Sequence, residues 1–533
     1  MSEQSRSSRS AGVVVPLFSL HSSASWGVGE IGDIPAMASW LGSAHQNILQ
    51  FLPLTEMAPD QPSPYSPLSA MAIDPQFISL RLLDDFVAEG GEGALDADRA
   101  RALAAVRARR TIDYPEVRTL KRRALTDAFE RFCEVEWAHD TPRARALKAF
   151  MAAEQWWLDA YSLYRALRAE CGERPWMDWD EPLRRRDPAA LAGARGDLAR
   201  DILFRQYLQW VADGQWRAAR HAAGPVALFG DFGFMVAADS ADVWARQDEF
   251  MLDATIGTPP DAFSETGQDW GLPPCRWEEM AKRDYEWLRQ RARRNATLYA
   301  GYRVDHLVGF YRTYVRPLSG QKAFFLPADS VDQVALGERL LALLTSAGSR
   351  LTVEDLGIIP PYVGESVRRM GLPGYRVLRW ERDWEREERP FLDPATYPIT
   401  SVAASGTHDT EPLAAWWESA APEDRRALGE IPSVRSASGG AVDWSADRLT
   451  AAVRDAVLEA LYASPSDFVI LPIQDIFGWR ERINQPATTG EQNWTYLVPW
   501  PVDRWASEPE AIACAHALRR WSDRYDRWKP DEP

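Results

Sequence analysis

The chain has 533 residues, of which 46% are hydrophobic, and its 61 basic and 77 acidic residues give a formal net charge of −16. Because phosphate groups bind basic surfaces, this balance argues against binding to nucleic acid or to an anionic membrane. No apolar run reaches the ~18 residues expected of a membrane-spanning helix. Residues 1–12 are rich in Ser and Arg, so we expect a disordered tail rather than a signal peptide.

The four cysteines, Cys133, Cys171, Cys275 and Cys514, are isolated and far apart in the sequence. This spacing is not that of a metal site or of a small disulfide framework. The sequence therefore predicts no metal site, and a reducing cytoplasmic location fits it best.

Residues 13–17 form an apolar run and are predicted to be the first strand. Gly27-Val28-Gly29-Glu30-Ile31-Gly32 follows, before a helix predicted over residues 34–42 and capped by Asp33. The glycine spacing is that of a dinucleotide-binding turn, and Glu56 lies at a tolerable distance for a ribose contact. However, that turn comes directly after its strand, whereas residues 18–26 intervene here, so the dinucleotide interpretation is disfavoured.

Residues 48–54 are predicted to be the second strand, and Ser63-Pro64-Tyr65-Ser66-Pro67 follows it. Two prolines around Tyr65 would hold an exposed ring on a stiff loop, although a plain structural turn has the same composition. Residues 80–216 show mostly helical spacing. One βα connection does not need so many residues, so we expect an inserted helical subdomain there.

Residues 225–231 return to β character and end on Asp231, which is either an inward-facing hydrogen-bond acceptor or a turn cap. Residues 257–271 are polar and glycine-rich. Such a loop is typical of a mobile cover, and we expect a lid at about residues 255–275.

Three later β runs each end on an acidic residue. Asp305 ends the first, with Arg303 on the same face; Glu354 ends the second; and Asp409 follows the third. Arg303 and Asp305 alone could be a structural ion pair. Three acids at three strand ends are instead typical of a parallel (β/α)8 barrel, which gathers catalytic groups at the carboxyl ends of its strands.

The remaining elements extend this pattern to the end of the chain. Strands are predicted at residues 374–380 and 468–475, an inserted helical subdomain at residues 410–466, and a last helix at residues 508–526. We therefore expect a single α/β domain over residues 13–533, a TIM barrel with large helical insertions and no C-terminal β-sandwich.

Three segments resemble the 4-α-glucanotransferases of the amylomaltase, or disproportionating enzyme, type, which are relatives of the α-amylases. They are Arg303-Val304-Asp305-His306, Glu354-Asp355-Leu356-Gly357 and Gly406-Thr407-His408-Asp409. The resemblance implies that Asp305 is the nucleophile, Glu354 the general acid/base and Asp409 the stabiliser of the transition state.

The resemblance also implies which residues bind substrate and what the partners are. The substrate-binding residues would be Ser63, Tyr65, Asp231, Gln268, Trp270, Arg303, His306, His408 and Asn493, and residues 482–488 resemble positions near the same cleft. Donor and acceptor would be α-1,4-glucans and maltooligosaccharides. No cofactor is implied, and we expect a monomer or a weak homo-oligomer.

The sequence departs from parts of this family at four positions. Ala262 stands where some members have an aromatic residue, Leu272 where they have Asn, and Val308 where they have Arg. The departures at Ala262 and Leu272 put the acceptor preference in doubt, not the reaction class. Glu411 is close enough in sequence to Asp409 to perturb its ionisation.

The expected reaction explains why these residue types are needed. Retaining cleavage of a glycosidic bond uses two carboxyl groups about 5–5.5 Å apart. Arg303 favours the ionised form of Asp305, whereas desolvation at the end of an apolar strand should raise the pKa of Glu354. Asp409, beside His408, can hold sugar hydroxyls and support the oxocarbenium charge.

Other functions remain open at this stage. An enolase-like acid cluster could bind Mg²⁺, but no Lys marks a strand end. A hydrolytic α-glucosidase or amylase would use the same acids, and a non-catalytic glucan-binding protein could keep the cleft. The 24 tryptophans offer flat apolar faces for pyranose rings, or simply fill the core.

Overall fold

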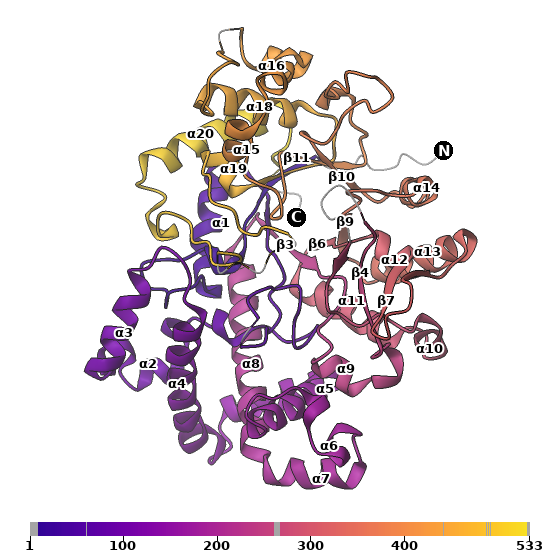
Figure 1. The fold of residues 1–533 in the computed structure, drawn as a ribbon. Helices are drawn as coiled ribbons and strands as arrows, with labels where there is room; N and C mark the ends of the chain where they lie inside the picture. The colour runs from indigo at the N-terminus through magenta and orange to yellow at the C-terminus, as the bar shows by residue number, and fades with distance from the viewer. Residues whose placement is uncertain are drawn as a thin grey trace.

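The computed structural model of the protein describes residues 9–59, 61–260, 267–440, 442–486, 488, 490 and 492–529. Eight parallel strands close into a barrel in the order β1-β12-β11-β10-β9-β6-β3-β2 (Figure 1). The strands are β1 (Ser10–Val14), β2 (Ile48–Gln50), β3 (Ala227–Phe232), β6 (Gly301–Val304), β9 (Arg350–Val353), β10 (Gly374–Val377), β11 (Ser401–Ala404) and β12 (Phe468–Pro472). The expected (β/α)8 barrel is confirmed.

The first strand begins earlier than its sequence suggests. Ser10 pairs with Phe468 of β12, and Gly12 packs so closely on Ile48 that an added Cβ would lie 2.4 Å from its carbonyl oxygen. Residues 10–12 therefore belong to the barrel, and the prediction of a tail through residue 12 is wrong for them. The small residues that made this segment look like a tail allow the close approach of β2.

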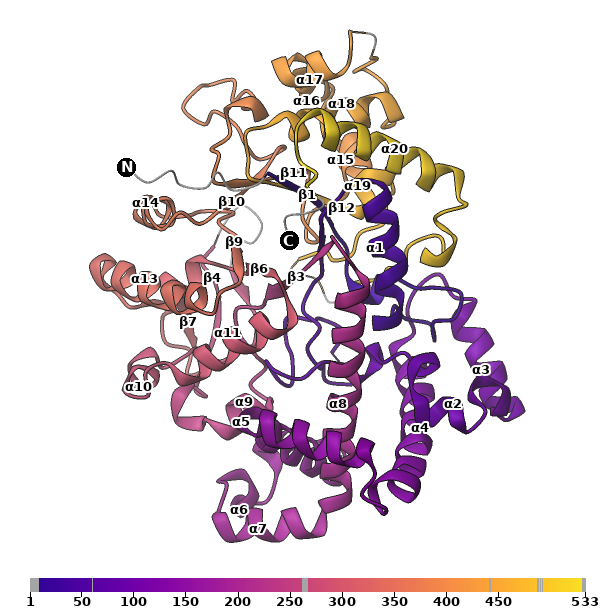
Figure 2. The same cartoon turned by 180° about the vertical axis from the view of Figure 1, so that it is seen from behind.

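Helices surround the barrel, and Figure 2 shows α1, α8 and α11 covering its rear side. The helices outside the two insertions are α1 (Ile34–Ser43), α9 (Ala241–Ala245), α10 (Trp277–Lys282), α11 (Glu286–Leu298), α12 (Val308–Tyr311), α13 (Ser330–Ser346), α14 (Pro361–Arg369), α19 (Ile473–Phe477) and α20 (Pro509–Arg524). None of the described residues after β12 belongs to a strand. Within the described part of the chain, no helix is both long and apolar enough to cross a membrane.

Two long connections are helical. Between β2 and β3 lie α2 (Asp84–Ala88), α3 (Ala97–Arg107), α4 (Tyr114–Phe132), α5 (Pro142–Glu170), α6 (Glu181–Arg184), α7 (Pro188–Asp197) and α8 (Ala199–Ala222). Between β11 and β12 lie α15 (Leu413–Ser419), α16 (Pro422–Glu430), α17 (Pro432–Ala437) and α18 (Ala451–Ala463). In Figure 1 the first group fills the lower part of the molecule and the second its upper part.

The glycine-rich segment after β1 is explained by packing. An added Cβ on Gly29 would lie 1.9 Å from the carbonyl oxygen of Leu17, so the loop needs glycine at that point. The carboxylate of Asp33 accepts hydrogen bonds from the Glu30 N–H (2.8 Å) and the Ser25 hydroxyl (2.6 Å). Asp33 is the N-cap residue of α1, as expected, but its side chain makes no capping hydrogen bond to that helix.

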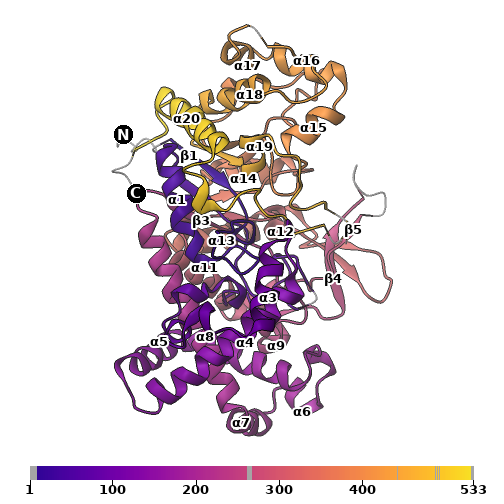
Figure 3. The same cartoon turned by 90° about the vertical axis from the view of Figure 1, so that its left-hand side faces the viewer.

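An antiparallel sheet stands beside the barrel and has no counterpart among the predicted elements. Its order is β5-β4-β7-β8, with β4 at Ala254–Thr258, β5 at Gln268–Asp269, β7 at Thr313–Pro317 and β8 at Phe324–Leu326. Figure 3 shows β4 and β5 on the right-hand side of the molecule. They flank the middle of the expected lid, whose residues 261–266 lie outside the described residues.

A buried ion pair ties the first helical insertion to the barrel. Lys121 on α4 lies 2.6 Å from the carboxylate of Glu30, and both side chains are almost fully buried. The Lys121 ammonium also donates to the carbonyl groups of Gln76 and Ile78. Because a buried charge is stable only when it is paired, removal of one partner leaves the other charge buried without a counter-charge.

We expect Lys121→Met to lower the free energy of unfolding by ~3–5 kcal/mol, because Glu30 would lose its buried counter-charge. Urea unfolding followed by circular dichroism measures the change. Lys121→Met with Glu30→Gln should recover most of the loss. Lys148→Met is the matched control, since Lys148 pairs with Asp140 on the surface and exposed pairs contribute little. A Lys121 variant no less stable than the Lys148 variant would contradict this account.

Candidate active site

Arg303 lies at the centre of a group of carboxylates at the carboxyl ends of the barrel strands. It lies on β6, and its side chain is 5% exposed. Its Nη1 atom is 2.6 Å from Oδ2 of Asp231 and 2.9 Å from Oδ1 of Asp305, and its Nη2 atom is 4.0 Å from Oε2 of Glu354. Three strands, β3, β6 and β9, therefore direct their acids to one guanidinium.

Glu354 follows directly after β9 and receives a hydrogen bond from the main chain of β6. The His306 N–H donates to its Oε2 atom over 2.8 Å. His306 has a left-handed φ of 45°, uncommon for a residue with a side chain, and this turn aims its N–H at Glu354. Burial raises the pKa of Glu354 to about 8; Arg303 opposes this and Asp305 adds to it.

Asp231 links this group to the loop that follows β2. The Tyr65 hydroxyl donates to its Oδ2 atom over 2.8 Å, beside the bond from Arg303. Burial raises the pKa of Asp231 to about 7, although the Arg303 charge lowers it in part. A carboxyl group that is neutral in part of the population near pH 7 reduces the repulsion among the acids around one guanidinium.

Asp409 lies on the loop after β11 and is held by a neighbouring loop. The Asn484 amide donates to its Oδ1 atom over 2.7 Å, and the Arg482 guanidinium donates to its main-chain carbonyl over 2.8 Å. The His408 Nε2 atom lies 3.4 Å from its Oδ2 atom. The family resemblance predicted that residues 482–488 lie near the cleft. It did not predict that the Asn484 amide contacts Asp409, because sequence spacing does not show which loops meet.

The loop that carries Asp409 is fixed from below by buried charges. Asp475 accepts hydrogen bonds from the Ser405 hydroxyl and the Leu413 N–H, each over 2.6 Å. Arg379 donates to the carbonyl groups of Ser405 and Glu411. These bonds fix both ends of the turn, so the direction of Asp409 does not depend on its own contacts alone.

Aromatic rings line both sides of the acids. Tyr65 stacks on His408 with ring centroids 5.2 Å apart and an interplanar angle of 13°, and Trp494 lies 5.8 Å from Tyr65. On the other side, Trp270 meets His306 edge-on at 4.7 Å. Burial lowers the pKa of His306 to about 4 and also lowers that of His408, so both imidazoles are neutral near pH 7.

The remaining candidate residues, Ser63, Gln268 and Asn493, make hydrogen bonds within the loops that carry them. The Ser63 hydroxyl accepts a hydrogen bond from the Tyr65 N–H, and the side-chain amide oxygen of Gln268 accepts one from the Trp270 indole N–H over 3.2 Å. Asn493 is buried, and its amide bonds to the main chain of Gln485 and Thr488. Ser63 and Asn493 therefore shape the loops on which Tyr65 and Trp494 stand.

The four departures from the family pattern lie in different settings. Leu272 is buried in an apolar cluster, Val308 begins the short helix α12, and the Glu411 carbonyl accepts from Arg379. Ala262 lies outside the described residues. The Leu272 position thus packs apolar side chains in this chain, where Asn would need polar partners.

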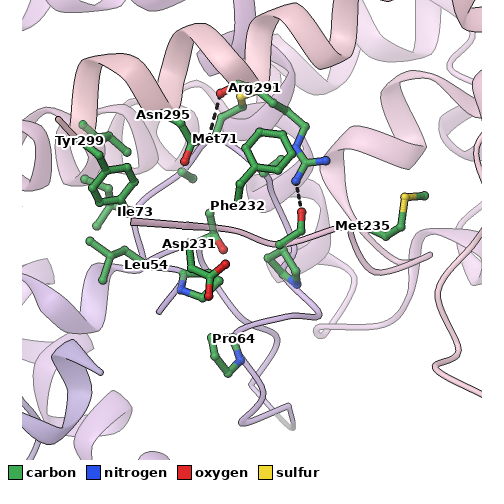
Figure 4. A pocket seen from close by; sticks show the side chains of 17 residues that line it. Leu54, Pro64, Met71, Ile73, Asp231, Phe232, Met235, Arg291, Asn295 and Tyr299 are labelled. Carbon is green, nitrogen blue, oxygen red and sulfur yellow. Dashed lines mark hydrogen bonds between the residues drawn. The ribbon is translucent and has the colours of Figure 1, made fainter. Parts of the chain in front are cut away.

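A small cavity lies beside Asp231, as Figure 4 shows, between Pro64, Met71, Phe232 and Tyr299. Its volume of about 30 Å³ holds one or two water molecules but no pyranose ring, so this cavity is not the sugar site. Over the described ranges, no group of three His, Cys, Asp or Glu side chains could hold a metal ion. The guanidinium of Arg303 occupies the centre of the carboxylates instead.

Comparisons with known proteins match this arrangement. A sequence model described as 4-alpha-glucanotransferase matches residues 15–501. A 4-alpha-glucanotransferase from Thermus thermophilus is 32% identical over 492 residues, covering 89% of this chain and 92% of its own length. One from Chlamydia pneumoniae is 29% identical over 505 residues, covering 91% of each chain.

Solved structures give the same result. The amylomaltase from Streptococcus agalactiae, in complex with acarbose, aligns with a TM-score of 0.80 and 25% identity, covering 98% of this chain and all of that one. These matches define the class as a glycosyl-transferring enzyme, and the parallel barrel with acids at one mouth agrees with it. Within that class, the chain belongs to the 4-alpha-glucanotransferase family.

Proposed function

We propose that this enzyme transfers α-1,4-glucan segments between maltooligosaccharides with retention, through a covalent glycosyl-enzyme intermediate on Asp305. The contact of Arg303 with both Asp305 and Glu354 is the observation that carries the proposal. The two carboxyl groups share one counter-charge, but Arg303 lies closer to Asp305 (2.9 Å) than to Glu354 (4.0 Å). Retaining enzymes need such a pair, with one group ionised and the other protonated.

In the first step, Asp305 attacks the anomeric carbon of the donor while the bond to the glycosidic oxygen breaks. Glu354 gives its proton to that oxygen, and the leaving segment departs with a free 4-hydroxyl group. In the second step, Glu354 takes a proton from the 4-hydroxyl of an acceptor. That oxygen attacks the anomeric carbon and releases Asp305 as a carboxylate.

Asp409 stabilises the charge that develops between these steps. Its carboxylate is placed by the Asn484 amide and flanked by the neutral His408 ring. A preorganised anion of this kind costs no reorganisation at the moment of reaction and supports the oxocarbenium-like transition state. Sugar hydroxyls would replace the solvent that now reaches its 43% exposed side chain.

The glucan substrate class rests on the relatives and on the rings around the acids. The related amylomaltase from Streptococcus agalactiae binds acarbose. Here the indole of Trp270 and the ring of Tyr65 flank the acids, and such flat faces suit pyranose C–H groups. Hydrolysis would use the same intermediate with water as the attacking group, so the balance of products separates the two reactions.

We expect kcat/KM for maltotriose to fall as the pH rises through about 8, because Glu354 must enter the reaction protonated. The sign follows from its raised pKa: the acid form predominates below that pH and is lost above it. Initial rates between pH 5 and 10 measure the profile. With an activated fluoride donor, whose leaving group needs no proton, Glu354→Gln should lack this basic limb. A basic limb retained in that variant would assign it to another group.

Incubation with maltotriose tests the reaction itself. Transfer yields glucose and longer chains with no net gain in reducing ends, whereas hydrolysis raises the number of reducing ends. Asp305→Asn should reduce the rate by at least about 10⁴-fold, as loss of a covalent nucleophile does in other enzymes. Its circular dichroism and thermal midpoint should stay close to those of the native enzyme. A substantial activity in this variant would rule out the nucleophilic role.

A further inference from the structure

The exposure of the tryptophans is uneven over the surface. The chain has 24 of them, all within the described residues, and 22 are buried or half-buried. The two exposed ones, Trp380 and Trp384, with exposed fractions of 40% and 64%, stand four residues apart in one loop. Two exposed indoles in one loop are unusual in a protein that buries or half-buries its other indoles. This loop is therefore a candidate binding surface for a ligand.

This loop belongs to the mouth of the barrel. It follows β10, which pairs with β9 on one side and with β11 on the other. Those neighbours lead to Glu354 and to Asp409. Because loops after the strands of a parallel barrel form its active face, the exposed indoles lie on the rim of the catalytic mouth. Ile358, 80% exposed, stands on the adjacent loop, four residues after Glu354.

The loop that carries Trp380 and Trp384 is held in place by specific contacts. Arg382 and Phe391 form an antiparallel bridge, with the guanidinium 3.9 Å from the ring centroid. Arg382 also pairs with Asp424 of α16 over 2.9 Å, which anchors the base of the loop to the second helical insertion. Arg389 lies over the Trp384 ring at 5.4 Å. The indole is therefore held from one side by a cation and presents most of its surface to solvent.

We propose that Trp384 forms an outer glucan-binding subsite, on which a sugar ring of a long donor or acceptor chain stacks. The inference rests on the proposed function and extends it to chain-length selectivity. A glucan that runs through the catalytic centre continues over the rim, where an indole offers a flat apolar face for the C–H groups of a pyranose. The charged side chains of the same loop, Asp383, Glu385 and Arg386, can accept from or donate to its hydroxyl groups.

A glucan fits this rim better than a protein partner does. The exposed apolar residues on the two loops are few, and five exposed charged side chains, residues 385–389, follow Trp384 directly. A protein interface would need a larger continuous apolar core. Continuity with the catalytic mouth also favours the substrate, because both chains of the transfer reaction must pass the rim.

The test compares substrates of increasing length in Trp384→Ala and Trp384→Phe variants. We expect Trp384→Ala to raise KM for long amylose chains by about five- to tenfold, the effect of losing one aromatic stacking contact. The increase should shrink towards maltotriose, and Trp384→Phe should retain most of the affinity. Migration in native gels containing amylose measures binding without turnover and should show weaker retardation of the Ala variant.

Leu318→Ala is the matched control, because Leu318 is 66% exposed and lies directly after β7 of the antiparallel sheet. A Trp384→Ala variant with unchanged KM and retardation for long chains, or with equal losses at every length, would overturn the outer subsite. The proposed function would stand if the native enzyme transfers maltotriose normally and the effect of Trp384→Ala on KM does not depend on chain length. Native enzyme without transfer would instead refute the proposed function itself.

Discussion

One buried guanidinium determines the electrostatics of the catalytic mouth. Arg303 is almost inaccessible to solvent, yet it contacts the carboxylates of Asp231, Asp305 and Glu354. A single positive charge cannot balance three negative ones in a low-dielectric site, so protons must remain on some of them. Burial is the main cause of the raised pKa values of Asp231 and Glu354, and the charge of Asp305 adds to both shifts. Under the proposed function, Glu354 therefore keeps the proton that it donates mainly because it is buried, with repulsion from Asp305 as a smaller contribution.

The barrel supplies the constraint that makes this arrangement possible. Four segments far apart in the sequence, ending at Asp231, Asp305, Glu354 and Asp409, finish at one edge because their strands are parallel. Around them, loops are fixed by their own bonds: Tyr65 by its hydroxyl on Asp231, and Asp409 by the Asn484 amide. The first helical insertion is tied to the loop after β1 by the buried pair of Lys121 and Glu30.

Much of this could be predicted from the sequence. Runs of β character marked all eight barrel strands, and several of them are apolar because strands covered on both faces need buried residues. The start of β1 was misjudged because Ser10, Ala11 and Gly12 carry little side-chain signal. The sheet of β4, β5, β7 and β8 was missed because short antiparallel pairings depend on distant partners. The contact between Asn484 and Asp409 was missed for the same reason, since it joins loops that only the closed barrel brings together.

The claim that depends most directly on Arg303 is that Asp305 becomes covalently glycosylated while Glu354 is the proton donor. A Glu354→Gln variant treated with α-maltosyl fluoride should form the glycosyl-enzyme intermediate, because the fluoride leaving group needs no acid. The intermediate should then break down slowly, because the substituted side chain cannot act as a base. Mass spectrometry of peptides after acid quench should then find one maltosyl group on the peptide that contains Asp305. A maltosyl group found on a different acidic residue, or no labelled peptide despite rapid loss of fluoride, would contradict the account.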